Sequence, residues 1–182
     1  MEVLEGTVTV GGERFPEVGD LVDALDAVGA EHGVTVQAFD ARYVVSRRHL
    51  ERAVELADRE RERGEGIARD RGVEIMLYAA GRRQIDRALE MGVGDGETPA
   101  AILVDAGGDD GDDRDDGEEP GAAESAAADA VREFLDEGET LGDYDEDRLR
   151  EFYGVGDREL SATTAGLEAL ALERVALLVV ER

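Results

Sequence analysis

Polar and apolar residues alternate in two stretches near the start of the chain, residues 3–10 and 34–39. Between them, apolar side chains recur every three or four residues, at Val18, Leu21, Val22, Leu25 and Val28. A period of two is typical of a half-buried strand, and a period near 3.6 is typical of a helix. The pattern therefore predicts a strand, a helix over 18–32 and a second strand.

Helical spacing returns after Ser46, a residue type that favours the position just before a helix. The apolar stripe that follows predicts a helix ending near Arg63 and consists of Leu50, Ala53, Val54 and Ala57. Four short elements are expected next. They are a helical piece over 67–71, a strand over 73–78, a helix that starts at Gly81 and runs to Met91, and a strand over 100–104.

The second half of the chain predicts helices over 122–135, 145–153 and 160–172, followed by an apolar closing strand over 174–180. Residues 106–125 are dominated by Asp, Glu and Gly, which predicts a disordered acidic loop. The fold class expected is α+β, a single mixed α/β domain in which a small sheet packs with several helices. We expect 1–105 as its N-terminal part, 106–125 as an inserted loop, and 126–182 as its helical C-terminal part with the final strand.

Charge adds a constraint on the environment of the protein. The chain has 46 acidic and 20 basic residues, a net charge of −26, and every basic residue is Arg. This composition is typical of a cytosolic protein from an extreme halophile, because carboxylates hold water and cations when salt is molar. No secretion signal or membrane-spanning run is present, so the sequence predicts a cytoplasmic protein without a membrane partner.

Several kinds of site are excluded by composition. The chain has no Cys, no Lys and only two His, so disulfides, thiolate metal sites, a phosphate-loop lysine and a histidine zinc cluster are ruled out. A calcium loop of the form D-x-[DN]-x-[DN]-G also fails. Counting back from Gly117, the first ligand is Asp112, but Arg114 stands where the second should be. We expect no metal and no cofactor.

Arginine is concentrated in one region. Residues 41–87 hold 12 Arg and 9 acids, a local charge of 12 − 9 = +3. Arg47 and Arg48 follow Ser46 in an expected first helical turn, and Arg82 and Arg83 follow Gly81 in another. Cations are unfavourable beside the positive end of a helix dipole. Two such conflicts indicate an anion bound at the paired helix starts.

The candidate binding and catalytic residues of this region also have simpler, structural interpretations. Arg47 can pair with Glu51 one turn later. His49 can be a packed residue at a helix start, and Glu74 a buried partner for an Arg rather than a catalytic acid. Tyr43 and Tyr78 can be wall and core residues, although either would stack on a base if it were exposed.

The order of these motifs resembles a known family. The matching segments run from Ser46 to Ala57, from Gly66 to Ala68 and from Val73 to Ala88, followed by Gly92. Together they closely resemble the accessory subunit of the KEOPS tRNA-modification complex, a family that includes the eukaryotic PRPK-binding protein. The ending from Glu173 to Leu178 is similar to the family's last strand. The resemblance covers most of the chain from about residue 35, except the acidic loop.

The resemblance implies a non-catalytic accessory protein. Its partners would be the kinase-like ATPase subunit of KEOPS and tRNA, whose single-stranded 3′ CCA end archaeal members hold. The RNA contacts expected on this chain are Arg47, Arg48, Arg82, Arg83 and Gln84, with His49 orienting or stacking. Arg suits this role because its flat guanidinium stacks on bases and binds phosphate with two parallel hydrogen bonds.

Kinase docking requires exposed apolar surface, for which the candidate residues are Leu160, Leu167 and Leu170, although they are also consistent with an ordinary core. Two other functions remain open. One is a small phosphate-handling enzyme with Glu74 or His49 as base, although no phosphate-loop or dinucleotide motif is present. The other is a purely structural subunit that binds its kinase and never contacts RNA.

Overall fold

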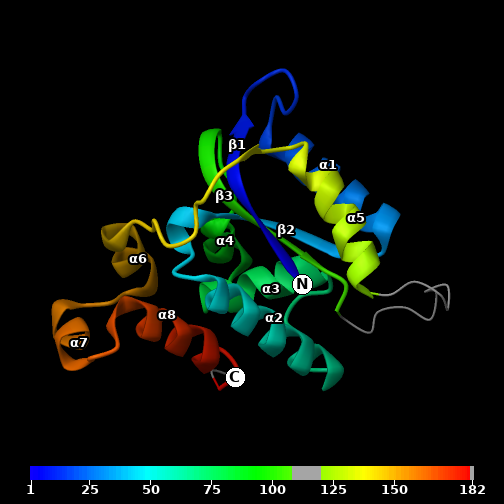
Figure 1. The fold of residues 1–182 in the computed structure, drawn as a ribbon. Coiled ribbons are helices and arrows are strands. Elements are labelled where there is room, and N and C mark those ends of the chain that lie inside the picture. The colour runs from blue at the N-terminus through cyan, green and yellow to red at the C-terminus, as the bar shows by residue number, and fades with distance from the viewer. Residues whose placement is uncertain (108–119, 181–182) are drawn as a thin grey trace. The chain divides into compact units, whose positions relative to one another are not determined.

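A computed structural model describes residues 1–107 and 120–180 of the chain (Figure 1). The chain divides into two compact units. Unit 1 consists of Met1–Asp40 and Val93–Thr140, and unit 2 consists of Ala41–Gly92 and Leu141–Arg182. Each unit is described by itself.

Unit 1 is built on a four-stranded antiparallel sheet with the strand order β2-β3-β1-β4. The strands are β1 Glu2–Val10, β2 Thr35–Asp40, β3 Gly96–Asp105 and β4 Asp136–Glu137. Leu4 lies opposite Ile102, and Val36 lies opposite Val104, so apolar side chains align across the strands. The strands predicted over 3–10, 34–39 and 100–104 are confirmed.

Helices α1 Val18–His32 and α5 Pro120–Arg132 pack side by side against the sheet (Figure 1). Their apolar faces and the sheet form one core, which includes Leu21, Leu25, Ala127 and Val131. The helices predicted over 18–32 and 122–135 are therefore confirmed. The loop predicted over 106–125 is wrong for residues 120–125, which form the first part of α5. Proline is favoured at the first position of a helix, so Pro120 is a suitable start. The remainder of that prediction, residues 108–119, lies outside the described residues.

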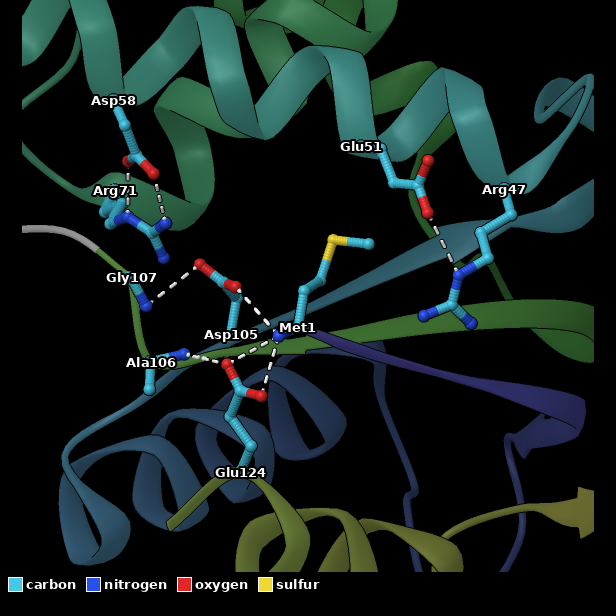
Figure 2. A network of polar contacts seen from close by, with 9 residues as sticks. All are labelled: Met1, Arg47, Glu51, Asp58, Arg71, Asp105, Ala106, Gly107 and Glu124. Carbon is cyan, nitrogen blue, oxygen red and sulfur yellow. Dashed lines mark hydrogen bonds and ion pairs between the residues drawn. The ribbon is translucent and has the colours of Figure 1, made fainter. Parts of the chain in front are cut away.

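Carboxylates hold the start of β1 against the end of β3 (Figure 2). The Met1 ammonium donates to both carboxylate oxygens of Glu124 on α5, each at 2.7 Å, and lies 3.4 Å from Asp105. The Ala106 N–H donates to Glu124 at 2.8 Å, and the Gly107 N–H donates to Asp105 at 3.1 Å. Burial lowers the ammonium pKa, but the two carboxylates outweigh it, and the net pKa is raised. The network therefore ties β1, β3 and α5 together.

In its described residues, unit 2 contains only helical elements, joined by turns and irregular segments. Its elements are the 3₁₀ turns η1 Ala41–Tyr43 and η2 Leu89–Met91, and the helices α2 Arg47–Glu62, α3 Arg71–Ala80, α4 Ile85–Ala88, α6 Glu146–Tyr153, α7 Asp157–Ala162 and α8 Gly166–Leu177. Helix α8 packs on α2, α3, α6 and α7. The helices predicted to end near Arg63 and to span 145–153 are confirmed.

The strand predicted over 73–78 is wrong, because those residues form the middle of α3. Asp70 caps the helix start by accepting a hydrogen bond from the Val73 N–H at 2.8 Å. The residues from Glu74 to Ala80 are all buried, so the run has no polar face that would show a helical period. The helical piece predicted over 67–71 is also wrong, since 67–70 is irregular and α3 begins at Arg71.

The closing strand predicted over 174–180 is wrong as well. Residues up to Leu177 belong to α8, and a turn follows. The buried side chains Leu167, Leu170, Ala171, Val175 and Leu178 keep helical spacing through the apolar end of the chain. The helix predicted over 160–172 is interrupted, because α7 ends at Ala162 and α8 begins at Gly166.

The α+β class is confirmed by these elements. The part boundaries predicted at 105 and 126 stay a prediction. In the parts of the chain that the structure describes, no helix is both long and apolar enough to cross a membrane, and no cluster of three His, Cys, Asp or Glu side chains could hold a metal ion.

Candidate nucleic-acid interface

Arg47 and Arg48 occupy the first turn of α2, as predicted, with no acidic residue in that turn. Ser46 stands at the N-cap position, but its hydroxyl donates to Glu168 of α8 at 2.7 Å instead of capping the helix. Arg47 lies 3.2 Å from Glu51, and both side chains are about half exposed. This i,i+4 pair relieves part of the conflict with the helix dipole, so the first Arg pair alone does not require a bound anion.

Gly81 ends α3 and does not begin a helix, so the second predicted conflict is wrong. Its φ of 59° is left-handed, and a Cβ at this position would lie 3.0 Å from the Arg174 backbone, so glycine is required here. Arg82 and Arg83 therefore follow the negative end of a helix dipole, where cations are favourable. Only Ile85–Ala88 of the helix predicted from Gly81 to Met91 is α-helical, and η2 follows it.

His49 connects the start of α2 to the end of α3. Its Nε2 lies 2.8 Å from the Ala79 carbonyl oxygen, which can only accept, so this nitrogen carries the hydrogen. The Tyr153 hydroxyl donates to the same oxygen at 2.8 Å. His49 has no exposed surface, which confirms the packed-residue interpretation and rules out stacking on RNA in this conformation. The structure thus brings the segments of the two Arg pairs together through a buried contact.

Burial dominates the electrostatics of this contact. It lowers the pKa of His49 from 6.5 to about 4, and the Ala79 carbonyl and the charge of Glu168 offset only part of the effect. Burial also raises the pKa of Tyr153. Both side chains are therefore neutral at neutral pH. Within the described chain, Nδ1 of His49 has no hydrogen-bond partner, so a proton there would be a buried charge with no acceptor for its hydrogen bond.

Arg82 opens onto a cavity of about 260 Å³ in unit 2. Its lining residues come from η1, from the α3–α4 turn through η2, and from α6: Tyr43, Arg82, Arg87, Glu90, Arg148, Glu151 and Phe152. The Arg82 guanidinium lies over the Phe152 ring, 5.6 Å from its centroid, and donates to the Phe152 carbonyl. Arg148 lies 5.3 Å from the Tyr43 ring centroid. The cavity thus combines cations with aromatic rings, the combination that binds unpaired nucleotides.

The charges around the cavity are unevenly paired. Arg87 lies 2.7 Å from Glu90, whereas Arg82 has no carboxylate partner in the described part of the chain. Helix α6 contributes Arg148 and Glu151 one turn apart. Three guanidinium groups against two carboxylates leave a small positive excess inside a strongly acidic protein. Such a local excess favours an anionic ligand.

Exposed apolar side chains lie next to this cavity in the sequence. Ile85 and Leu89 are 48% and 54% exposed, four residues apart on α4 and η2. Arg83 and Gln84, two of the predicted RNA contacts, are exposed immediately before them. An exposed segment that mixes apolar, amide and cationic side chains suits the faces and edges of unpaired bases.

The chain was compared with known protein families. The family model described as kinase binding protein CGI-121 matches residues 20–178. The chain belongs to this family. A search among curated proteins returned no match. The family description states kinase binding. Because an interface core requires exposed apolar side chains, the exposed apolar residues of this CGI-121 family member are the ones to consider.

The leucines predicted to bind a partner are mostly core. Leu167 and Leu170 of this CGI-121 family member are 6% and 5% exposed, and Leu160 is half-buried, so the prediction of an exposed docking face is wrong for the first two. They are buried because they form the inward stripe of α8. At the C-terminal end of the same helix, Leu177 is exposed at 37% and Val180 beyond it at 74%.

Sequence reasoning missed three residues that build the cavity, Phe152, Arg148 and Glu151. All three lie on α6, more than 60 positions from Arg82 in the sequence. Tyr43, expected as a wall residue, lines the cavity with its ring edge-on to Phe152, 5.1 Å between centroids. Tyr78 is 2% exposed and is a core residue. The local signal for the missed residues is an aromatic pair at the end of an amphipathic helix, Phe152 and Tyr153.

Proposed function

We propose that this chain is a non-catalytic accessory subunit of the KEOPS complex for tRNA threonylcarbamoyladenosine modification. It binds the kinase-like ATPase subunit, and it holds the single-stranded 3′ CCA end of tRNA. The observation that carries the RNA part is the cavity in which Arg82, without a carboxylate partner in the described chain, faces aromatic and guanidinium planes. The family membership supports the kinase part.

An unpaired RNA end fits this site better than a duplex does. A cavity of about 260 Å³ is smaller than most sites for whole ligands, which measure roughly 300 to 1,000 Å³, but it accommodates part of one nucleotide. A phosphate oxygen would accept hydrogen bonds from Arg82, and a base would stack on the Arg148 guanidinium or the Tyr43 ring. Neighbouring nucleotides would continue over Arg83, Gln84 and Ile85.

The alternative of a phosphate-handling enzyme required Glu74 or His49 as a general base, and the structure encloses both side chains. The Glu74 carboxylate accepts hydrogen bonds from the Ile67 N–H at 2.9 Å and from the Ala68 N–H, so it holds the turn before α3. Among the described residues it has no Arg partner, although the sequence indicated one. His49 is enclosed and neutral. A general base must reach the proton that it removes, and neither group is accessible to a substrate.

Trimming the CCA end is expected to remove tRNA binding. The proposed RNA contacts are made to unpaired nucleotides, and an end without them offers only a duplex stem. Titrating the chain with intact and trimmed tRNA in molar KCl, followed by fluorescence anisotropy, measures the difference. We expect an affinity loss of at least about tenfold, equal to about 1.4 kcal/mol.

Other results of this titration have distinct meanings. Equal binding of both tRNAs would contradict the proposed site, because the contact would then lie on the stem or elsewhere. Binding of neither tRNA, together with retained binding of the kinase, would identify the purely structural subunit. Turnover of a nucleotide by the isolated chain would favour the enzyme.

For the kinase, we propose the exposed end of α8. A Leu177→Asp variant is expected to lower kinase affinity by roughly tenfold or more, because a charge replaces apolar surface at an interface. Val22→Asp is the matched control, since Val22 is a comparably exposed apolar residue (47%) on α1. Calorimetric titration with the purified kinase partner distinguishes the two variants. Equal effects of both substitutions, or none, would contradict the assignment.

A further inference from the structure

One carboxylate that lines the cavity forms no ion pair or hydrogen bond with the other lining residues. Glu151 lies on α6 and lines the cavity together with three arginines. In the part of the chain that the structure describes, its side chain makes no hydrogen bond and no ion pair, whereas the other lining carboxylate, Glu90, is paired with Arg87 at 2.7 Å. Glu151 is therefore available to a ligand.

The surrounding cations are directed to other partners. Arg82 donates to the Phe152 carbonyl, and the Arg148 Nε lies 3.8 Å from Asp145 while its guanidinium lies over the Tyr43 ring. An unpaired carboxylate weakens the attraction of such a site for any phosphate. Its presence is understandable if the ligand brings a hydrogen-bond donor as well as an anion, because an ionised carboxylate only accepts.

We infer that Glu151 is a specificity-determining residue, which selects a nucleobase carrying an exocyclic amino group. This inference rests on the proposed binding of an unpaired RNA end. Cytosine N4 and adenine N6 are donors that a carboxylate accepts. Uracil and hypoxanthine present a carbonyl oxygen at the same position, which a carboxylate repels. The cavity therefore takes an amino base, with the adjoining phosphate on Arg82 and the ring stacked on Arg148 or Tyr43.

The test compares short 3′-overhang RNAs that differ only in their last three nucleotides. One set ends in C-C-A, and the others replace each cytidine by uridine or the adenosine by inosine. Each replacement changes the amino group to a carbonyl and adds a hydrogen to the neighbouring ring nitrogen. The wild-type chain is expected to prefer at least one amino base over its carbonyl counterpart by roughly tenfold, the lower range of a specific base contact. Anisotropy titrations in molar KCl measure each affinity.

A Glu151→Gln variant separates specificity from charge. The amide both donates and accepts, so it binds amino and carbonyl bases alike, and we expect the preference to fall to about twofold or less. Affinity for the ends with carbonyl bases should rise, because the carboxylate that repels their carbonyl oxygen is removed. Glu146→Gln removes the same charge from the exposed first turn of α6, outside the cavity lining, and should keep the preference.

The possible outcomes distinguish the role of Glu151 from the proposed binding of RNA. A preference that survives in Glu151→Gln, or one that Glu146→Gln loses equally, overturns the role of Glu151. Binding of all ends by the wild-type chain without any base preference also overturns it, while the proposed RNA function stands. Failure of the wild-type chain to bind any of the ends overturns both.

Discussion

An Arg82→Glu variant is expected to bind CCA-ended RNA about 100-fold more weakly than the wild-type chain. A hydrogen bond from a charged donor contributes about 1.5 to 3 kcal/mol, and reversal of the charge adds repulsion between the new carboxylate and the phosphate, so a total near 3 kcal/mol corresponds to this factor. Arg82 has the largest expected effect among the predicted RNA contacts because it lines the cavity and has no carboxylate partner within the described chain. Anisotropy with the intact tRNA measures the loss.

Arg52→Glu provides the matched control. It makes the same change in net charge, but Arg52 lies on α2 outside the cavity lining, where it pairs with Glu55 at 2.6 Å. At 1 M salt the screening length is about 3 Å, so a charge reversal outside the cavity lining should change the affinity less than about threefold. An Arg82→Gln variant tests the loss of the positive charge without introducing a carboxylate. Equal weakening by the Arg52 and Arg82 reversals would contradict a local contact.

The contrast between Arg82 and Arg47 shows what the sequence can and cannot predict about the site. Composition and spacing locate both Arg pairs. The sign of their dipole interaction depends on whether Gly81 begins or ends a helix, and glycine is far commoner just after a helix than at its first position. The cavity depends on α6, whose contact with the α3–α4 turn is a tertiary contact that no local pattern encodes.

The elements that were predicted wrongly from the sequence have a common physical cause. Elements with one buried face, such as β1 and α2, show their period in the sequence, and their predictions are confirmed. Helix α3 is buried nearly all round, so it presents a short apolar run that is indistinguishable from a buried strand. Its Asp70 cap and Gly81 stop, on either side of ten helical residues, are the local signals of a helix.

Acid is expected to destabilise the chain through His49 before most carboxylates titrate. Burial lowers the pKa of His49 to about 4 in the folded state, against 6.5 when unfolded. Between these values the unfolded chain binds more protons, so the free energy of unfolding falls as pH falls through 6.5 and levels off below 4. The loss is about 2 kcal/mol between about pH 7 and 5, and about 3 kcal/mol in full.

Urea unfolding followed by circular dichroism at constant salt, from about pH 7 to about pH 5, measures this loss. A His49→Gln variant should lose less stability over that range, because its amide can still donate to the Ala79 carbonyl but has no proton to gain. His32→Gln, in the last turn of α1, removes the chain's other imidazole and tests whether the slope belongs to His49. An acid slope unchanged in His49→Gln would mean that this histidine is not buried and neutral. The start of α2 and the end of α3, and with them the two Arg segments, would then be joined by some other contact than the buried hydrogen bond from His49 to Ala79.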